Sequence, residues 1–254
     1  MSIASIAADS GTMITRSVRH TLRNFDALLI SVILPVMLLL IFTYVFGGAI
    51  SPDTEYINYV VPGIILLCGG YSASMTAISV TKDMTEGIVD RFRTMSMAAS
   101  AVLTGHVTAS VLRNFASTGI VMGLAVVLGF RPTGGPLEWL GALGVLALFI
   151  LAMSWLAAMF GLIAKSVEAA SGFSFGILFL PYVSSAFVPV ETLPEWLRPI
   201  AEHQPITPVN ETVRGLLFGL PIGDYLLPAV LWCLGIMLVA VVASVLLWRK
   251  SARR

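Results

Sequence analysis

Six apolar segments, each about as long as a membrane-spanning helix, take up most of this 254-residue chain. A helix needs about 20 mainly apolar residues to cross the hydrocarbon core of a bilayer. The segments that meet this length are residues 27–46, 58–80, 107–130, 137–164, 169–188 and 225–248. Charged residues make up only 11% of the chain, against about a quarter in soluble domains. The sequence therefore predicts an all-α integral membrane protein with six transmembrane helices in a single domain, residues 1–254.

Basic residues are concentrated on one side of the predicted membrane. Six spans place both termini on the same side. That side carries Arg16, Arg19, Arg23, Lys82, Arg91, Arg93, Lys165, Arg249, Lys250, Arg253 and Arg254. The other side carries Arg131, Arg198 and Arg214. Loops rich in Lys and Arg stay in the cytoplasm, so both termini are predicted to be cytoplasmic.

An N-terminal interfacial helix is predicted within residues 1–26. Ile14, Val18, Leu22 and Phe25 recur at helical spacing, and arginines occupy the opposite face. Such a helix lies in the membrane surface with its arginines at anionic headgroups. A topology signal with no further role explains the pattern equally well.

The cytoplasmic segment 81–106 combines an apolar stripe with charges of both signs. The stripe comprises Met84, Ile88, Phe92, Met95, Ala99 and Val102. Lys82 with Glu86, and Asp90 with Arg93, stand at spacings that allow ion pairs on a helix. A helix lying on the headgroups would explain the stripe, but anionic lipid repels carboxylates. A protein partner therefore explains the segment better.

A hairpin of two short helices is predicted on the outer side, in residues 189–224. Thr192 and Glu195 match a capping box at the start of the first helix. Thr207 is predicted to cap the second helix, which ends at Gly219. Neither helix is long enough to span, so the hairpin is predicted to be interfacial or re-entrant. Its characteristic residues are Glu191, Pro194, Trp196, Pro205 and Pro208.

The sequence contains few signs of catalytic chemistry. It has no GxxxxGK[ST] loop for ATP and no HExxH zinc motif. Residues 172–176 match GxSxG, but a nucleophile elbow needs a strand before the serine, and this one lies in an apolar helix. An intramembrane serine protease would need a histidine within the spans. Gly172 and Gly176 instead favour close helix packing, and the chain is predicted not to be an enzyme.

Arg113 is the one strong charge within the interior of a predicted span. It follows His106 by seven residues, which places it roughly 10 Å from the cytoplasmic end of a helix. At that depth an arginine can reach the interface with its long side chain, so snorkelling is predicted. With no carboxylate near the midplane, ion-coupled transport lacks its usual groups.

Several blocks resemble one known family. These blocks are EGIVDRFRTM (86–95), SAVLTGHV (100–107), LAMSWLAAMFGLIAKSVEAASG (151–172) and SSAFVPVETLPEWLRPIAEHQPITPVNETVRGLL (184–217). In them the sequence resembles ABC-2 type transporter permeases, in particular the daunorubicin-resistance group of actinobacteria. One departure is the turn after the first block, residues 96–100, where the family often has proline and then arginine.

The resemblance implies the permease subunit of an ATP-driven exporter in the bacterial plasma membrane, moving hydrophobic drugs, antibiotics or lipids outward. Such a subunit binds no cofactor itself, because ATP and Mg²⁺ bind a separate ATPase. A second permease subunit, identical or different, completes the membrane part, and no nucleic-acid partner is expected. A membrane scaffold or lipid-handling subunit that transports nothing is the alternative. The sequence leaves open the cargo and which ATPase is the partner.

The resemblance also implies a role for the charged segment. A coupling helix from about Met84 to Met95 would enter a cleft of the ATPase. The residues that would contact the ATPase are Glu86, Ile88, Asp90, Arg91, Phe92 and Arg93.

Overall fold

The computed structural model describes residues 15, 25–47, 56–86 and 99–251, and within these ranges the secondary structure is helical. The long elements are α2 (Phe25–Leu40), continued by the π-helical turn η1 (Ile41–Phe46), then α4 (Tyr56–Thr85), α6 (Ala99–Val127), α7 (Pro136–Ile163), α8 (Val167–Phe179) and α11 (Leu226–Ser251). The short ones are η2 (Leu180–Val183), η3 (Val190–Thr192), α9 (Arg198–His203), α10 (Ile206–Phe218) and η4 (Gly223–Tyr225).

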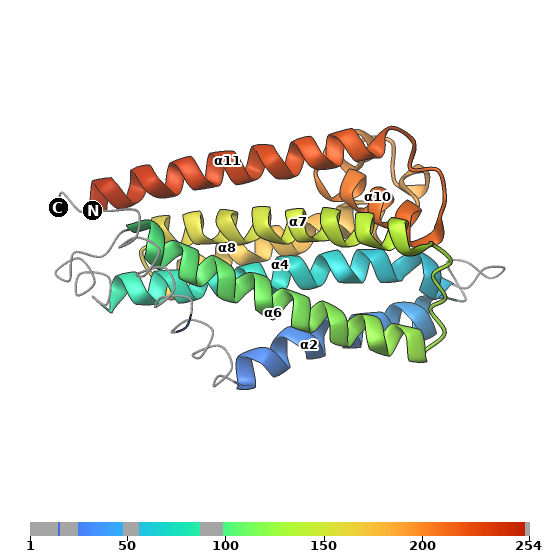
Figure 1. Cartoon of the computed structure of the whole chain (residues 1–254), viewed down its shortest axis with the longest axis horizontal. Helices are drawn as coiled ribbons and strands as arrows, with labels where there is room; N and C mark the ends of the chain where they lie inside the picture. The colour runs from blue at the N-terminus through green and yellow to red at the C-terminus, as the bar shows by residue number, and fades with distance from the viewer. Residues whose placement is uncertain (1–14, 16–24, 48–55, 87–98, 252–254) are drawn as a thin grey trace.

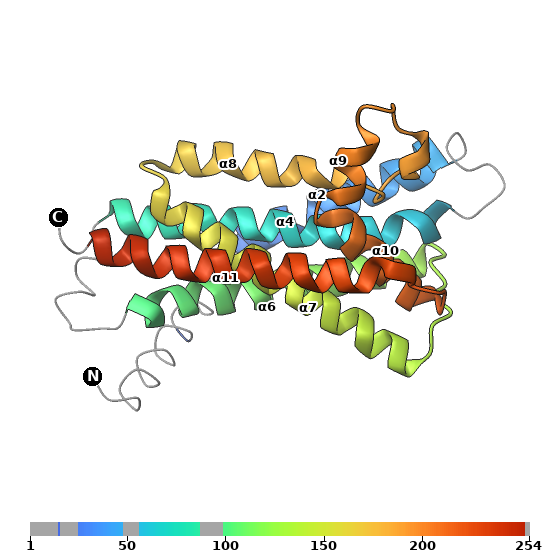
Figure 2. The ribbon, with the colours of Figure 1, turned by 90° about the horizontal axis from the view of Figure 1, so that it is seen from above.

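The long helices run side by side, and consecutive ones alternate in direction (Figures 1 and 2). The end that carries α9 and α10 is called the hairpin end here. The opposite end, where α4 finishes and α6 begins, is called the loop end. All described connections between long helices lie at one of these two ends, as an up-and-down bundle requires.

Four described helices are long and apolar enough to cross a membrane: Tyr56–Thr85, Val102–Val127, Pro136–Ile163 and Gly223–Trp248. They correspond to the second, third, fourth and sixth predicted spans. The first and fifth predicted spans correspond to shorter apolar helices, Ser31–Phe46 and Val167–Val183. The helical class is confirmed, and the count of six spans stays a prediction.

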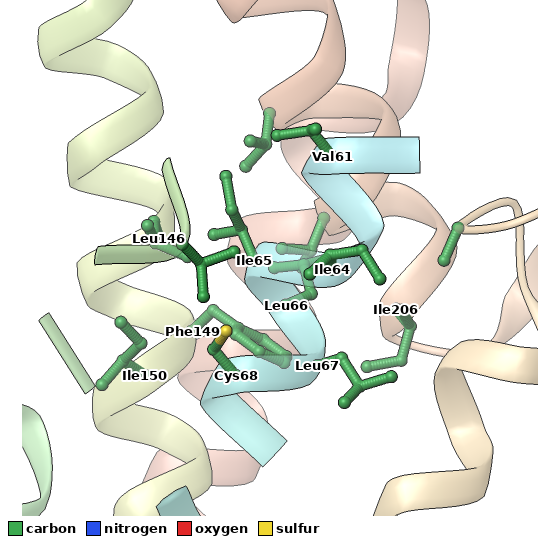
Figure 3. Packing of buried hydrophobic residues seen from close by; sticks show 14 of the residues in the cluster. Val61, Ile64, Ile65, Leu66, Leu67, Cys68, Leu146, Phe149, Ile150 and Ile206 are labelled. Carbon is green, nitrogen blue, oxygen red and sulfur yellow. The ribbon is translucent and has the colours of Figure 1, made fainter. Parts of the chain in front are cut away.

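Helix α4 lies at the centre of the bundle and packs against α2, α6, α7, α8 and α10. Before its last turn, its sequence is apolar or small on every face. A helix of that kind is buried in protein or in a membrane, and α4 is buried by its neighbours. Ile64, Ile65 and Leu66 are completely buried, and they pack near Phe149 of α7 (Figure 3). Helix α11 is different: it packs against α7 and α10, and most of its apolar side chains face outward.

Glycines allow α4 to approach its neighbours closely. A Cβ atom on Gly161 of α7 would lie 2.7 Å from the Ala77 carbonyl oxygen and 2.7 Å from Val80 Cβ. Thr81 Oγ1 donates a hydrogen bond to the Gly161 carbonyl oxygen at 3.0 Å. At the hairpin end, a Cβ on Gly63 would lie 2.6 Å from the Ala186 carbonyl oxygen. These contacts bring backbones together, as small residues do in membrane proteins.

The predicted packing residues Gly172 and Gly176 lie in α8 and are exposed. No atom of the described chain comes within 4 Å of a Cβ built on either glycine. Their packing role is therefore not met by the described part of the chain and stays a prediction for contact with another subunit. Residues 172–176, which match the GxSxG motif, are helical throughout. They therefore do not form the strand and turn of a nucleophile elbow.

The fifth apolar segment is helical over a shorter range than the predicted residues 169–188. Regular α-helix ends at Phe179, and a 3₁₀ turn follows to Val183. Proline has no N–H group to donate to the preceding turn, so Pro181 interrupts the helix. Ser184 closes the next turn: its hydroxyl donates to the Pro181 carbonyl at 2.6 Å and accepts from the Ala186 N–H at 3.0 Å.

Both predicted caps in the hairpin are wrong, although the two short helices exist. Thr192 lies at the end of η3 and donates to the Pro189 carbonyl at 2.6 Å, while α9 begins only at Arg198. Thr207 lies inside α10, where its hydroxyl donates to the Ala201 carbonyl and accepts from the Ser185 N–H. It therefore links three segments. Gly219 ends α10 with a φ of 62°, as predicted.

Candidate functional site

One of the predicted ATPase-contacting residues, Glu86, lies within the described ranges. It follows the last turn of α4, is exposed, and places its carboxylate 3.7 Å from Lys82 Nζ, which confirms the predicted pair. An exposed pair of this kind contributes at most about 0.5 kcal/mol, so it is easily exchanged for another partner. The other five residues lie outside the described part: Ile88, Asp90, Arg91, Phe92 and Arg93.

Asp83 and His106 form a buried contact at the loop end. Asp83, in the last turn of α4, places Oδ2 3.1 Å from Nε2 of His106 in α6. Their side chains are 12% and 10% exposed. This contact was not predicted from the sequence, because 23 residues separate the two positions. An acidic residue ending one span and a histidine starting the next were the available signal.

Apolar side chains support this contact and join four helices. The cluster comprises Val80, Val102, Leu103, Val107, Ala158 and Trp248, from α4, α6, α7 and α11. Residues 87–98 thus begin and end on two helices that are fixed to each other. A displacement applied there would reach both helices together.

Arg113 does not snorkel, contrary to the prediction. Its guanidinium donates to Ser72 Oγ at 3.0 Å, to the Ser72 carbonyl at 3.1 Å and to Thr76 Oγ1 at 3.0 Å. Ser72 and Thr76 stand one turn apart on α4 and supply all three acceptors, so the charge is satisfied inside the bundle. None of the described carboxylates lies within ion-pair distance of it.

Helix α6 carries further polar side chains, and with Arg113 they form what we call the polar seam: Ser110, Arg113, Asn114 and Ser117. Ser110 meets Ser154 of α7 at 2.9 Å, and Ser117 meets Ser31 of α2 at 3.0 Å. Asn114 is completely buried, and within the described residues its amide has no hydrogen-bond partner. Hydrogen bonds between helices are a main source of association in membranes, and α6 uses them with α2, α4 and α7.

A second polar network holds the hairpin end together. The Ser185 carbonyl oxygen accepts from Tyr59 Oη at 2.9 Å, Asn210 Nδ2 at 3.1 Å and Arg214 Nη2 at 2.8 Å. Arg214 also pairs with Glu211 and lies 3.9 Å above the centre of the Tyr59 ring. The start of α4, the turn after η2 and α10 are thereby fixed to one another.

We expect Arg214→Met to destabilise this end of the molecule. The change removes donors from two carbonyl oxygens and leaves the partly buried Glu211 carboxylate without its cation, which should cost about 2 kcal/mol. Thermal unfolding of the purified protein in detergent would measure it. Arg198→Met is the control, because Arg198 Nε donates to a single carbonyl, Leu193 O, at 2.8 Å. Equal midpoints for the two variants would contradict the expectation.

The described part of the bundle contains at least two cavities. The larger, about 590 Å³, lies at the hairpin end between the start of α4, α9, α10 and the start of α11. The smaller, about 130 Å³, is almost wholly apolar and lies between α4, α6, α7 and α10. Thr118 contributes a hydroxyl group to its lining. Among the described residues, no three His, Cys, Asp or Glu side chains come together as metal ligands would.

The predicted hairpin residues differ in their exposure and in whether they line the larger cavity. Trp196 is 73% exposed and Glu191 is also exposed, whereas Pro208 is buried in the first turn of α10. Glu191 and Pro208 line the larger cavity, and Pro194, Trp196 and Pro205 do not.

Comparison with known proteins gives concordant results. The family model for the ABC-2 type transporter matches residues 10–218. A daunorubicin resistance ABC transporter permease protein of Streptomyces coeruleorubidus is 35% identical over 200 residues, which cover 78% of this chain and 71% of the relative. A probable doxorubicin resistance ABC transporter permease protein of Mycobacterium tuberculosis is 23% identical over 239 residues, covering 91% and 84%.

Proposed function

Because the chain belongs to the ABC-2 type transporter family, we propose that it is the membrane-spanning permease subunit of an ATP-driven exporter. The similarity to the Streptomyces permease, 35% identity across 78% of this chain, carries the proposal. The ATP would bind to a separate ATPase subunit together with Mg²⁺. The absence of a P-loop in the sequence supports this division of labour.

The cargo we propose is a hydrophobic or amphipathic molecule, such as a drug, an antibiotic or a lipid, moved outward. The names of two relatives support this class, since they refer to resistance to daunorubicin and to doxorubicin. The many apolar side chains that the bundle exposes, on α11 and on α2 with η1 above all, are suited to contact with lipid tails, in which such a cargo would dissolve.

We further propose six membrane spans with both termini in the cytoplasm of a bacterial cell. Lys82 and Lys165 lie at the loop end, where the last turn of α11 also contains Arg249 and Lys250. The positive-inside rule then places that end in the cytoplasm. The hairpin end would face outward. The interfacial helix proposed for residues 1–26 and the coupling helix proposed for about Met84 to Met95 both fall largely outside the described residues.

Energy would enter through the coupling helix. Closure of the ATPase on ATP would displace this helix, and the helix would displace α4 and α6. The contact between Asp83 and His106 supports this route, because it joins the two helices beside the proposed docking segment. A second permease subunit would complete the path for the cargo.

The test is to tag the chain, extract it gently from its native membrane and identify co-purifying proteins by mass spectrometry. We expect a P-loop ATPase in about equal amount, and its loss when Phe92→Ala is combined with Glu86→Lys. The matched control is Phe179→Ala with Glu195→Lys, which changes one exposed aromatic ring of α8 and one exposed carboxylate of the hairpin end. If no ATPase appears in several mild detergents, a scaffold that transports nothing becomes the better explanation.

A further inference from the structure

The larger cavity is built from segments that are far apart in the sequence. Its lining combines carboxylates, an arginine that pairs with one of them, and aromatic rings. The carboxylates are Glu191, Glu202, Glu211 and Asp224, and the aromatic rings are Tyr59, Tyr225 and Trp232. A volume of about 590 Å³ is in the range of small-molecule sites.

The charges in the cavity wall are unbalanced. Among the described residues, Arg214 is the only arginine or lysine in the lining, and it is already paired with Glu211. Its Nη2 atom donates to the carbonyls of Tyr59 and Ser185. Within the described residues, Glu191, Glu202 and Asp224 have no basic group within 4 Å. Four carboxylates against one guanidinium leave three negative charges around the cavity when His203 is neutral.

The aromatic rings are not equally available to a ligand. The face of Tyr59 is covered by the Arg214 guanidinium, whose Cζ atom is 3.9 Å from the ring centre. Tyr225 and Trp232 are 45% and 44% exposed, and both line the cavity. Tyr225 also lies within the electrostatic field of Glu191, Glu202 and Glu211. An aromatic face beside carboxylates is an environment that attracts organic cations.

Part of the cavity wall is held in place before any ligand arrives. The network around Ser185 fixes Tyr59, Asn210 and Arg214, and His203 Nδ1 contacts the Pro199 carbonyl oxygen at 2.9 Å. A preformed wall reduces the ordering cost of binding. An anion would be repelled by the net charge, and a bare metal ion would leave the aromatic rings unused.

We propose that this cavity is a binding site for organic cations that carry an aromatic or aliphatic body. Glu202, Asp224 and Glu191 attract the charge, and Tyr225 and Trp232 contact the body. The proposal concerns the chain by itself and does not depend on ATP-driven transport. Binding can be measured without any ATPase, so failure here leaves the proposed function standing, and failed transport leaves this site standing.

The experiment uses two probes of the same shape and opposite charge, tetraphenylphosphonium and tetraphenylborate. Binding to the purified chain in lipid nanodiscs is measured by equilibrium dialysis, with empty nanodiscs subtracted to remove partition into lipid. We expect saturable binding of the phosphonium and none of the borate. Glu202→Gln with Asp224→Asn should weaken phosphonium binding about tenfold, which corresponds to 1.4 kcal/mol.

Two control substitutions lie in the same hairpin but outside the cavity lining. Glu195→Gln removes an exposed carboxylate, and Trp196→Leu removes an exposed indole, and neither residue lines the cavity. We expect both to bind the phosphonium as the unaltered chain does, while Trp232→Leu binds it about fivefold more weakly. Unfolding midpoints of all variants show that each is folded. Equal binding of the two probes, or equal losses in the cavity and control variants, would overturn the proposal.

Discussion

Gly161→Val is expected to prevent the chain from folding stably. A Cβ atom at this position would meet the Ala77 carbonyl oxygen and Val80 Cβ at 2.7 Å, and Val80 Cγ1 at 2.9 Å. A backbone oxygen cannot move aside as the end of a flexible side chain can, so α7 would have to separate from α4. That separation would also break the hydrogen bond from Thr81 to the Gly161 carbonyl. Overpacking at such a contact should cost about 3 kcal/mol, at the upper end of the usual range, because a backbone must move.

The matched control is Gly144→Val, which makes the same substitution in the same helix, α7, at an exposed glycine that faces open space. The two variants share any effect of valine on the helix itself, so a difference between them reports the contact between α4 and α7. Detergent-extracted protein is followed by gel filtration and thermal unfolding. We expect aggregated or missing protein for Gly161→Val and a normal profile for the control. Equal midpoints for Gly161→Val and the unaltered chain would disprove the close approach.

Arg113→Met is expected to abolish most transport while the fold remains intact. Methionine fills much of the space of the arginine stem, and the change removes a partly buried charge that has no carboxylate partner among the described residues. Such a charge is costly in a membrane, so the unfolding midpoint should stay the same or rise. The three hydrogen bonds to Ser72 and Thr76 disappear. If motion passes from α4 to α6 through them, transport in proteoliposomes with the ATPase should fall at least tenfold.

Two further variants separate charge from geometry at this position. Arg113→Lys keeps the charge, but an ammonium cannot reproduce the planar fork that reaches both Ser72 and Thr76, so transport should stay low. Arg131→Met changes an exposed arginine at the hairpin end and should leave transport unchanged. A large fall in the unfolding midpoint of Arg113→Met would show that the residue supports the fold and not the motion.

The helices of this chain were predictable because a bilayer imposes length and apolarity on any helix that crosses it. The alternating course of the helices and the end of α10 at Gly219 follow from such local rules. The contacts between helices do not follow from local rules. The snorkelling prediction for Arg113 considered one helix alone, whereas its acceptor Ser72 lies 41 residues earlier on α4. The run from Ser72 to Thr76 is unusually polar for a span, and that signal went unused.

The spacing of glycines also did not predict which helices contact each other. The spacing of Gly172 and Gly176 marks a face on which another helix can pack, but it does not say which helix or which subunit. Gly161 has no such repeat, and its contacts on α4 come from Ala77 and Val80. In the hairpin, Thr192 matches the capping-box sequence, but its hydroxyl donates a hydrogen bond to the Pro189 carbonyl oxygen and does not cap a helix. The cavity at the hairpin end was beyond prediction, because its walls come from four separate segments.

The close approach of α4 and α7 has a mechanical consequence. Backbones that touch at Gly161 cannot slide past each other without clashing, and α6 is tied to α4 by Arg113 at mid-length and by His106 at the loop end. These three helices therefore behave as one stiff beam. Deformation must then be taken up around the beam, where α2, α8 and α11 flank it. A displacement applied at the loop end would therefore be transmitted along α4, α6 and α7 to the hairpin end.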